Sequence, residues 1–567
     1  MDLVLCWHMH QPDYRHQGRS LKPWTWLHAI KDYSDMAAHL ERAPGARAVI
    51  NFSPVLMLQL QAYPQRIRAL LQQGTPIEDP ILDALAGQLP GRRGRLELTR
   101  ALLRVNKTTM KPRFPAYQRL FEAASRALEA GQALGGQELD DLLTWYVLLW
   151  LGESLRGMAL PARLQQQARA FALDDRRALL QWLADVIEDL LPRYRALAER
   201  GTIELSVTPW SHPILPLLLD LESARESMPD ATLPRRPYPG GAQRCDWQLA
   251  QGLRVFRETF GQVPAGCWPS EGALSNATLS LLGRHGFRWT ASGAQVLFNS
   301  LGSTDGLPQL DAWKLAQAPN GPDTPLVFFR DDALSDRIGF EYARWPAADA
   351  VADFIAHIEQ RLDAWTQRPE RKRAPVLSII MDGENAWEYY PANGHEFLEL
   401  LYARLTRHPR LRLTTFSEAL ERHVPRILPA LVAGSWVHGT FSTWIGDPAK
   451  NRAWALLAHA KSAADAALAP VREQCRQQGQ ALPGWVEEIQ RQLAVCEASD
   501  WFWWLGPDNR LQDGPEFDRL FRLHLAELYV LLGTVPPAEL EQPLDDYGYL
   551  PEDAPSAQAG AMRQATE

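Results

Sequence analysis

The sequence predicts an α/β protein built around a barrel of parallel strands. Short apolar segments rich in Val and Ile recur within the first 425 residues, which is typical of strands buried on both faces. Helical patterns separate these segments along the chain. Several segments also end abruptly in polar or charged residues, and parallel barrels carry functional residues at the carboxyl ends of their strands.

Length and composition indicate an ordinary soluble protein of more than one domain. The chain has 567 residues, of which 46% are hydrophobic and 22% charged. A net charge of −8 without a basic block argues against nucleic acid as a partner. We find no signal-peptide pattern and no apolar run long enough for a membrane helix. Nothing in the sequence indicates the oligomeric state.

The five cysteines are scattered, odd in number and without CxxC spacing. This usage predicts reduced thiols in a cytoplasmic protein, with no disulfide framework and no zinc site. The 21 tryptophans are the one unusual feature of the composition. Flat apolar side chains suit a site for sugar rings, although tryptophans also pack protein cores.

The first predicted strand, 3–8 (LVLCWH), ends in a pair of histidines. His8 and His10 share parity with Val4 and Cys6, so both can point to the same side of the strand. One interpretation is a metal-binding pair, since imidazole is a common ligand. A second is a hydrogen-bonding pair on the floor of a polar cleft, and a third is a structural pair that bonds backbone groups.

A helix around 26–40 and a second strand at 48–52 come next. From about 55 to 200 the pattern is helical, with breaks rich in Gly and Pro. We expect 55–200 to be a helical insertion that follows the second strand.

The strand pattern resumes at 202–207 (TIELSV) and includes Glu204, with His212 a short turn later. A carboxylate inside an apolar strand requires a partner or a task, because an unpaired buried charge is costly. We therefore expect Glu204 and His212 to meet near one strand end. The alternative is an edge strand whose Glu204 reaches water.

The segment 263–275 (VPAGCWPSEGALS) forms a tight polar corner around Glu271. Pro269 prevents a long regular strand here. Ser270 can cap a helix over 273–285, so one interpretation makes Glu271 an acid near a helix N-terminus. The other makes it a strand-end carboxylate that faces a cleft.

Two more strands are expected around 287–291 and 325–329. The second leads into a loop crowded with Arg330 and three aspartates. Arg330 could neutralise a carboxylate and keep it ionised, or it could belong to a surface ion-pair cluster.

The stretch 376–388 (VLSIIMDGENAWE) reads as a buried strand that ends in acidic residues. Alternation places Asp382 on the same side as Ser378 and Ile380, at the point where the strand ends. Asp382 is therefore expected to face a cleft, and Glu384, two residues later, is its rival. A simple Asp-Gly turn with solvated carboxylates is the alternative.

The remaining chain divides at about residue 425. A helix at 394–405 and a strand-to-helix segment at 411–423 complete the barrel domain, 1–425. We expect 426–548 to be a mostly helical domain that sends two loops toward the barrel mouth. Helical patterns cover 451–469, 483–498 and 515–532, and the aromatic loop SDWFWWLG lies at 499–506. The tail, 549–567, is expected to be disordered.

Five segments together resemble glycoside hydrolase family 57. They are HMHQPDY (8–14), IELSVTPWSHPILPLL (203–218), GCWPSEGALS (266–275), IIMDGENAW (379–387) and WVHGTFSTWIGDPAKN (436–451). They occur in the order of the family. Pro269 and Ser270 differ from the more usual form of the third motif, and the long insertion is not universal in the family.

The resemblance implies an incomplete (β/α)7 TIM-like barrel with a helical C-terminal domain. It also implies retaining chemistry on α-glucans or maltooligosaccharides, of the α-amylase type. No cysteine or histidine set in the sequence completes a tetrahedral site, so we expect no cofactor and no transition metal. Glu271 would be the nucleophile, and Asp382 the general acid and base. The residues implied or expected to bind the substrate are His8, His10, Glu204, His212, Trp268, Arg330, Glu384, His438, Trp444, Asp447, Asn451, Asp500, Trp501 and Trp503.

The two carboxylates suit this chemistry. In retaining cleavage one carboxylate attacks the anomeric carbon and the other protonates the leaving oxygen, across about 5–5.5 Å. A 4-α-glucanotransferase or branching enzyme shares the first half-reaction and differs in its acceptor. Two alternatives of other classes are a metal-dependent deacetylase with His8 and His10 as ligands, and a glucan-binding protein without catalysis.

Overall fold

The computed structural model describes residues 1–303, 307–316, 323–368, 374–507 and 513–546. The expected disordered tail, 549–567, lies outside the described residues. Among the described helices, none is both long and apolar enough to cross a membrane. All five cysteines are buried and free.

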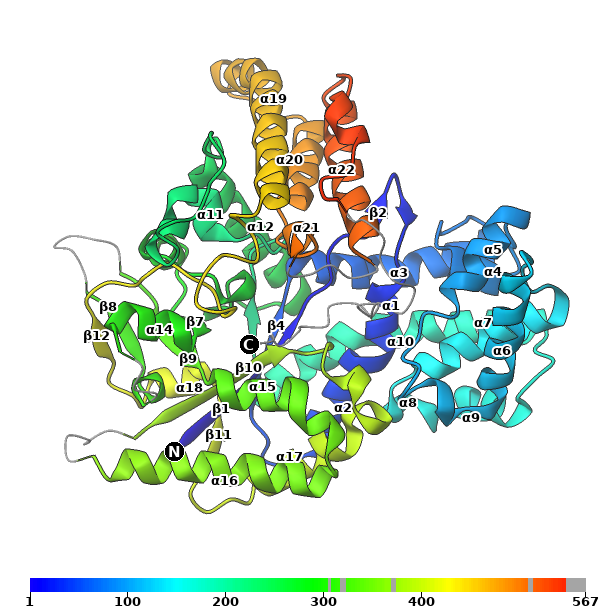
Figure 1. Ribbon diagram of the computed structural model, residues 1–567, viewed down its shortest axis with the longest axis horizontal. Coiled ribbons are helices and arrows are strands. Elements are labelled where there is room, and N and C mark those ends of the chain that lie inside the picture. The colour runs from blue at the N-terminus through cyan, green and yellow to red at the C-terminus, as the bar shows by residue number, and fades with distance from the viewer. Residues whose placement is uncertain (304–306, 317–322, 369–373, 508–512, 547–567) are drawn as a thin grey trace.

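A closed ring of seven parallel strands forms the centre of the protein (Figure 1). A single residue pair, Ser378 with Arg330, joins β10 to β9 and closes the ring. The ring confirms the predicted (β/α)7 barrel. Its strands, in spatial order, are β1 (Asp2–Met9), β4 (Ala48–Phe52), β5 (Ile203–Val207), β6 (Gly266–Cys267), β7 (Trp289–Gly293), β9 (Leu326–Arg330) and β10 (Val376–Asp382).

Short strands extend this sheet outside the ring. β11 (Arg412–Thr414) pairs with β1. β8 (Trp313–Leu315) pairs antiparallel with β9 and parallel with β12 (Arg426–Leu428). β12 lies just beyond residue 425, so the first residues of the region expected to be a helical domain still belong to the sheet. The division of the chain at 425 therefore remains a proposal.

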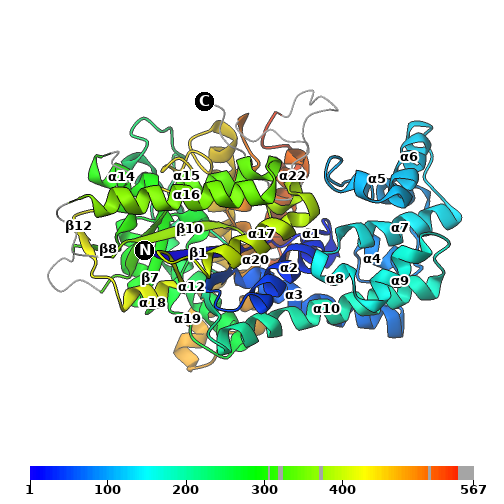
Figure 2. The same ribbon diagram turned by 90° about the horizontal axis from the view of Figure 1, so that it is seen from below.

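Helices follow most of the ring strands and cover the outside of the barrel (Figure 2). The helix that follows Glu271 begins later than expected, because Ser275, and not Ser270, accepts the capping bond from the Thr278 N–H. The covering helices are α1 (Trp24–His28), α2 (Ser34–Arg42), α3 (Pro54–Gln73), α10 (Leu173–Glu199), α11 (Leu215–Leu219), α12 (Gly241–Phe260), α13 (Asn276–Arg284), α14 (Ala294–Leu301), α15 (Asp332–Asp336), α16 (Ala347–Thr366), α17 (His395–Leu405) and α18 (Phe416–Leu420).

The expected insertion is helical throughout its regular elements. The long helices α3 and α10 pack against each other and against the barrel, and the helices between them form a lobe at one side of the molecule (Figures 1 and 2). The lobe has its own apolar packing, which includes buried Leu142, Trp145 and Tyr146 on α7. Its helices are α4 (Pro80–Leu85), α5 (Arg92–Ala101), α6 (Pro115–Glu129), α7 (Gly136–Trp150), α8 (Glu153–Arg156) and α9 (Ala159–Gln167).

The C-terminal helices stand together above the barrel in Figure 1. They are α19 (Pro448–Gln478), α20 (Gly484–Cys496), α21 (Asp500–Trp503) and α22 (Gly514–Leu531). The short helix α21 occupies the segment that was expected to be an aromatic loop. It brings this segment to the mouth of the barrel.

Alternation along the strands sorts the core into two clusters. Val4 and Cys6 of β1 pack with Val49, Phe328 and Ile380 inside the ring. The intervening residues of β1, such as Leu5 and Trp7, pack outward in the larger cluster. His8 and Asp382 continue the inward series at the carboxyl ends of β1 and β10, where they are paired in register.

Candidate active site

A cavity opens at the carboxyl ends of the barrel strands. Side chains from the ends of β1 and β10, from the turns after β5 and β6, and from α21 converge on it. The residues that line it are His8, His10, Gln11, Pro12, Tyr14, His212, Glu271, Asp382, Glu384, Asn385, Asp500, Trp503, Trp504 and Phe517.

Three stacked histidines form one wall of the cavity. The ring centroids of His10 and His212 lie 3.9 Å apart, and those of His8 and His212 lie 5.0 Å apart. Burial, reinforced by the neighbouring histidines, lowers the pKa of His8 to about 3 and that of His212 well below its ordinary value. Both rings are therefore neutral at pH 7 and can donate one hydrogen bond and accept another.

Each histidine is oriented by a hydrogen bond at Nδ1. The partners of His8, His10 and His212 are the Asn51 Oδ1 at 2.7 Å, the Ser53 Oγ at 2.7 Å and the Ser499 Oγ at 2.8 Å. The Nε2 atoms then meet one another and Asp500. His8 Nε2 lies 3.0 Å from His212 Nε2, and His10 Nε2 lies 3.1 Å from both carboxylate oxygens of Asp500.

Glu271 occupies a strained turn directly after β6. Its backbone is left-handed, with φ 57°, which is uncommon for a residue other than glycine and is found where function requires it. The indole N–H of Trp436 donates to Glu271 Oε2 over 2.8 Å, and His212 Nδ1 lies 4.0 Å from Oε1. Desolvation and the charge of Asp382 raise the pKa of the Glu271 carboxyl well above its usual range, although the Trp436 bond opposes this.

Asp382 ends β10 and lines the same cavity as Glu271. Its Oδ2 accepts a hydrogen bond from the Asn385 amide over 2.7 Å. Desolvation raises its pKa to about 6, against the effects of Asn385, His10 and Arg330. Two carboxyl groups with raised pKa values at one cavity retain a proton more readily than free carboxyl groups do.

Glu384, the rival acid, is tied to the cavity floor. Its Oε1 accepts from the Gln11 amide over 3.1 Å and from the backbone N–H of His10 over 3.4 Å. Desolvation and the charge of Asp382 raise its pKa well above the usual range. Gly383 separates the two acids and has no room for a side chain, since a Cβ there would lie 2.2 Å from the Met9 sulfur.

Arg330 lies beside Asp382 at the neighbouring strand end. It is buried and forms ion pairs with Asp332 at 3.0 Å and Asp336 at 2.7 Å. Its guanidinium also lies over the Trp436 ring, 5.3 Å from the centroid. Arg330 thus contacts Trp436, which bonds Glu271. Its positive charge also lowers the pKa of Asp382.

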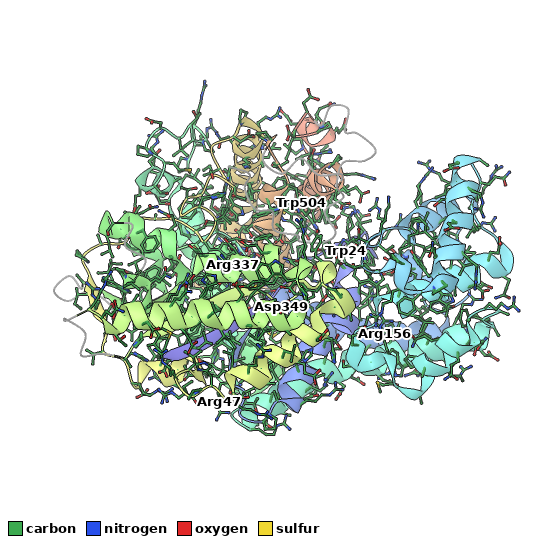
Figure 3. The ribbon with its side chains drawn as sticks, turned by 60° about the horizontal axis from the view of Figure 1, so that its bottom comes forward. Trp24, Arg47, Arg156, Arg337, Asp349 and Trp504 are labelled. Atoms are coloured by element: carbon green, nitrogen blue, oxygen red, sulfur yellow. The ribbon has the colours of Figure 1, made fainter. Side chains whose placement is uncertain are left out.

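The C-terminal region closes the cavity with aromatic side chains. Trp503 and Trp504 line it from α21 and the residue that follows. Trp504 stacks on Phe517 at 4.2 Å and lies where the C-terminal helices meet the barrel (Figure 3). Flat apolar faces beside carboxylates and neutral histidines suit a polyhydroxylated ring compound as the ligand.

The prediction that Glu204 lies near His212 at the site is wrong. Glu204 is the second residue of β5, and so lies toward the opposite end of the barrel. Its oxygens accept from the Trp289 indole at 2.6 Å, the Ser417 N–H at 2.8 Å and the Ser417 hydroxyl at 2.6 Å. The carboxylate is a structural group with its own partners.

Seven further predicted residues are not among those that line the cavity, and two of them are Arg330, described above, and Trp444, described below. His438 is exposed, and Trp268 is buried inside the barrel against Trp436. Trp501 is part of the core between α20 and α22, where its indole N–H bonds the Val495 carbonyl. Asp447 caps α19, and Asn451 bonds backbone groups near the start of that helix.

Trp444 does not line the cavity but contacts a residue that does. It is fully buried, outside the cavity lining, and packs against Trp503 with centroids 6.0 Å apart. It therefore supports a cavity residue from behind.

Several residues of the site were missed from the sequence. Asn51 is the next-to-last residue of the strand 48–52, and Ser53 follows it. The rule that polar residues at strand ends line a cleft would have found both. Asn385 and Ser499 lie in the segments 376–388 and 499–506, which the sequence analysis had singled out. Trp436 carries no sequence signal for its bond to Glu271, because that contact joins residues 165 positions apart.

His10, His212 and Asp500 could together hold a metal ion, since one ligand atom of each lies within 4.8 Å of the others. The close parallel stacking of the two rings and the His8–His212 bond suit a hydrogen-bonded wall better than a shared metal. The prediction that activity needs no transition metal stays untested. Loss of activity in EDTA that zinc restores would contradict it.

Comparisons with known proteins bear on the family and on the fold. The model of Glycosyl hydrolase family 57 matches residues 4–431. No curated protein matches the chain.

Three solved structures share the fold. A GH57-type branching enzyme from Pyrococcus horikoshii has a TM-score of 0.56 and 16% identity, over 95% of this chain and 92% of that one. An alpha-amylase from Thermotoga maritima has a TM-score of 0.54 and 12% identity, over 94% of this chain and 93% of that one. A 4-alpha-glucanotransferase from Thermococcus litoralis has a TM-score of 0.50 and 14% identity, over 93% of this chain and 59% of that one.

Proposed function

The chain belongs to glycosyl hydrolase family 57, and we propose that it cleaves α-1,4 links in α-glucans with retention of configuration. The observation that carries this proposal is that Glu271 and Asp382, from separate strand ends, line one cavity beside neutral histidines and tryptophans. Maltooligosaccharides, starch and glycogen are the proposed substrates.

In the proposed first step Glu271 attacks the anomeric carbon and forms a covalent glycosyl-enzyme. Asp382 gives its proton to the leaving glycosidic oxygen as the bond breaks. In the second step the Asp382 carboxylate takes a proton from water, and the water oxygen displaces Glu271. Two displacements at one carbon return the starting configuration.

The carboxyl groups require different protonation states for this sequence. Their pKa values are raised by the same kinds of cause, so the two shifts alone do not separate acid from nucleophile. Each carboxylate also accepts one side-chain hydrogen bond, Glu271 from the Trp436 N–H and Asp382 from the Asn385 amide, so these bonds do not separate the two roles. The assignment follows the family motifs in which the two residues stand, and a proton on Asp382 would relieve the repulsion between the two groups.

The histidine wall is proposed to hold the sugar unit under attack. The Nδ1 bonds fix the three rings at the cavity wall. The Nε2 atoms of His8 and His212 lie against each other and would exchange that contact for sugar hydroxyl groups, and Asp500 would accept from a further hydroxyl. Trp503 and Trp504 provide the apolar faces. Glu384 is proposed to hold the floor through Gln11 and the His10 backbone.

The acceptor in the second step decides the type of enzyme. Water gives an amylase, whereas a sugar hydroxyl gives a 4-α-glucanotransferase or a branching enzyme. Incubation with maltoheptaose and with glycogen, followed by analysis of chain lengths, linkages and reducing ends, tests this. We expect a rise in reducing ends. Redistributed chains without such a rise would indicate transfer, and unchanged substrates would contradict the proposal.

We also propose a cytoplasmic location. Five buried free thiols support a reducing compartment. Fractionation of the source cells with a periplasmic marker and a cytoplasmic marker would test this.

A further inference from the structure

A second cavity adjoins the site on the side of Asp382. It has a volume of about 520 Å³ and is lined from four parts of the chain. These are Arg330 at the end of β9, the end of β10 with the residues that follow it, the segment from α15 to Arg344, and the loop after α5 in the helical lobe. A space of this size is within the range of small-molecule sites.

Asp382 and Asn385 line both cavities, whereas Glu271 lines only the first. The second cavity therefore begins at the proposed acid and extends away from the proposed nucleophile. In retaining cleavage the acid protonates the leaving oxygen, so the leaving part of the substrate must lie on the side of the acid.

Two polar atoms at this cavity have no hydrogen-bond partner among the described residues. They are the hydroxyl of Ser335, which is fully buried, and the Oδ1 of Asn385. A buried polar atom without a partner costs free energy, so such atoms point to a missing ligand or water. Aromatic surface is also available, because Tyr389 is 43% exposed and Phe340 is partly buried.

The lobe supplies a fixed wall. The Asn106 amide and the Thr109 hydroxyl both donate to the Glu388 carbonyl, over 3.1 and 2.6 Å. The Asn106 Oδ1 in turn accepts from the backbone N–H groups of Thr108 and Thr109. These bonds hold the loop against the segment that follows Asp382, and both threonines line the cavity.

We infer that this second cavity binds the glucose units on the leaving-group side of the scissile bond, and the incoming acceptor sugar when transfer occurs. Tyr389 stacks on a sugar ring, Ser335 and Asn385 bond its hydroxyl groups, and the helical lobe completes the site through the Asn106 loop. The lobe thus helps to select the acceptor. This inference rests on the proposed function.

α-Maltosyl fluoride separates the two cavities in an experiment. Attack on its anomeric carbon breaks the C–F bond and releases fluoride, so no sugar is needed on the leaving-group side. Maltoheptaose, in contrast, must place glucose units there. The measurement is kcat/KM for both substrates in the full-length protein.

Tyr389→Ala and Ser335→Ala test the inference. We expect the ratio of kcat/KM for maltoheptaose to that for the fluoride to fall about tenfold in each variant. Ser335→Ala removes an unpaired hydroxyl, so its Tm should not fall, which excludes unfolding as the cause. The matched control is Trp485→Ala, since Trp485 is 47% exposed on α20 and lines neither cavity.

Asn106→Ala tests whether the helical lobe positions the wall of the second cavity, because Asn106 holds its loop in place. Loosening the loop should raise KM for maltoheptaose more than it lowers kcat, and should lower the yield of transfer to added maltose. Equal losses on both substrates, or an unchanged ratio in the Tyr389 and Ser335 variants, would overturn the inference. Wild-type protein that releases no fluoride would instead overturn the proposed function.

Discussion

The two ends of the barrel each hold a partly buried glutamate, and the two differ in how their oxygens are satisfied. Near the start of β5, Glu204 accepts three hydrogen bonds from Trp289 and Ser417. After β6, Glu271 accepts one side-chain bond, from Trp436, and faces a cavity. Desolvation raises the pKa of both carboxyl groups.

A raised pKa therefore does not distinguish the structural acid from the catalytic one. The distinction lies in the unused bonding capacity. Each carboxylate has about four acceptor positions, and Glu204 uses three of them on the protein. Glu271 keeps most of its positions for a ligand, and its strained backbone holds it in place.

The largest expected effect is the loss of activity in Glu271→Gln. Turnover should fall by several orders of magnitude on every substrate, because no leaving group replaces a missing nucleophile. Glu204→Gln is the matched control and should retain turnover within about threefold, since it touches no cavity residue. Steady-state kinetics on maltoheptaose and an aryl maltoside measures both. Similar losses in the two variants would remove the distinction between the two ends.

A smaller and more selective loss is expected for Asp382→Asn. Cleavage of a natural glucan should fall strongly, because its leaving oxygen is basic and needs a proton. An activated aryl glycoside needs little protonation, so formation of its glycosyl-enzyme should be partly spared. Pre-steady-state release of the aryl group checks this. Should Glu384→Gln show the same leaving-group dependence and Asp382→Asn lack it, the acid is Glu384.

Glu204→Gln should instead reduce stability. Its new NH₂ group would face the donors of Ser417 or Trp289, and an unsatisfied pair of this kind costs about 2 kcal/mol. Urea unfolding at pH 7 measures the change, with Glu271→Gln as the comparison. A loss of stability in Glu271→Gln but not in Glu204→Gln would reverse the roles of the two residues.

The smallest effect concerns pH. Asp382 has a pKa of about 6 in the folded protein against an ordinary value of 3.8. Between these values the folded state binds more protons than the unfolded state, so this group's contribution to stability falls as the pH rises from about 4 to 6. Asp382→Asn removes this titration. Its unfolding free energy relative to wild type should rise by about 2 kcal/mol from pH 4 to pH 7; a constant difference would contradict the raised pKa.

Much of the barrel could be predicted because its strands are short apolar runs buried on both faces. The strand 48–52 matches β4 to the residue. β8 and β12 were missed, since each has three residues, and Ile427 of β12 is 60% exposed, which leaves no apolar pattern.

The site was predicted less completely. The cost of a buried charge correctly predicted that Glu204 has partners, but it does not give the height of a residue along the barrel, and Glu204 stands at the start of its strand. The strand-end rule succeeded for His8, Glu271 and Asp382, where sequence position fixes height. In the aromatic segment, the turn of α21 sends Trp501 into the core and Trp503 to the cavity, a choice that depends on packing against α22.

Azide rescue can show whether Glu271 is the nucleophile and Asp382 the acid. In Glu271→Gly, azide would take the place of the nucleophile and displace the leaving group of an aryl glycoside once. In Asp382→Gly, azide would instead attack the glycosyl-enzyme on Glu271 in a second displacement. We expect a glycosyl azide of inverted configuration from the first variant and of retained configuration from the second. The same configuration from both variants would contradict this assignment.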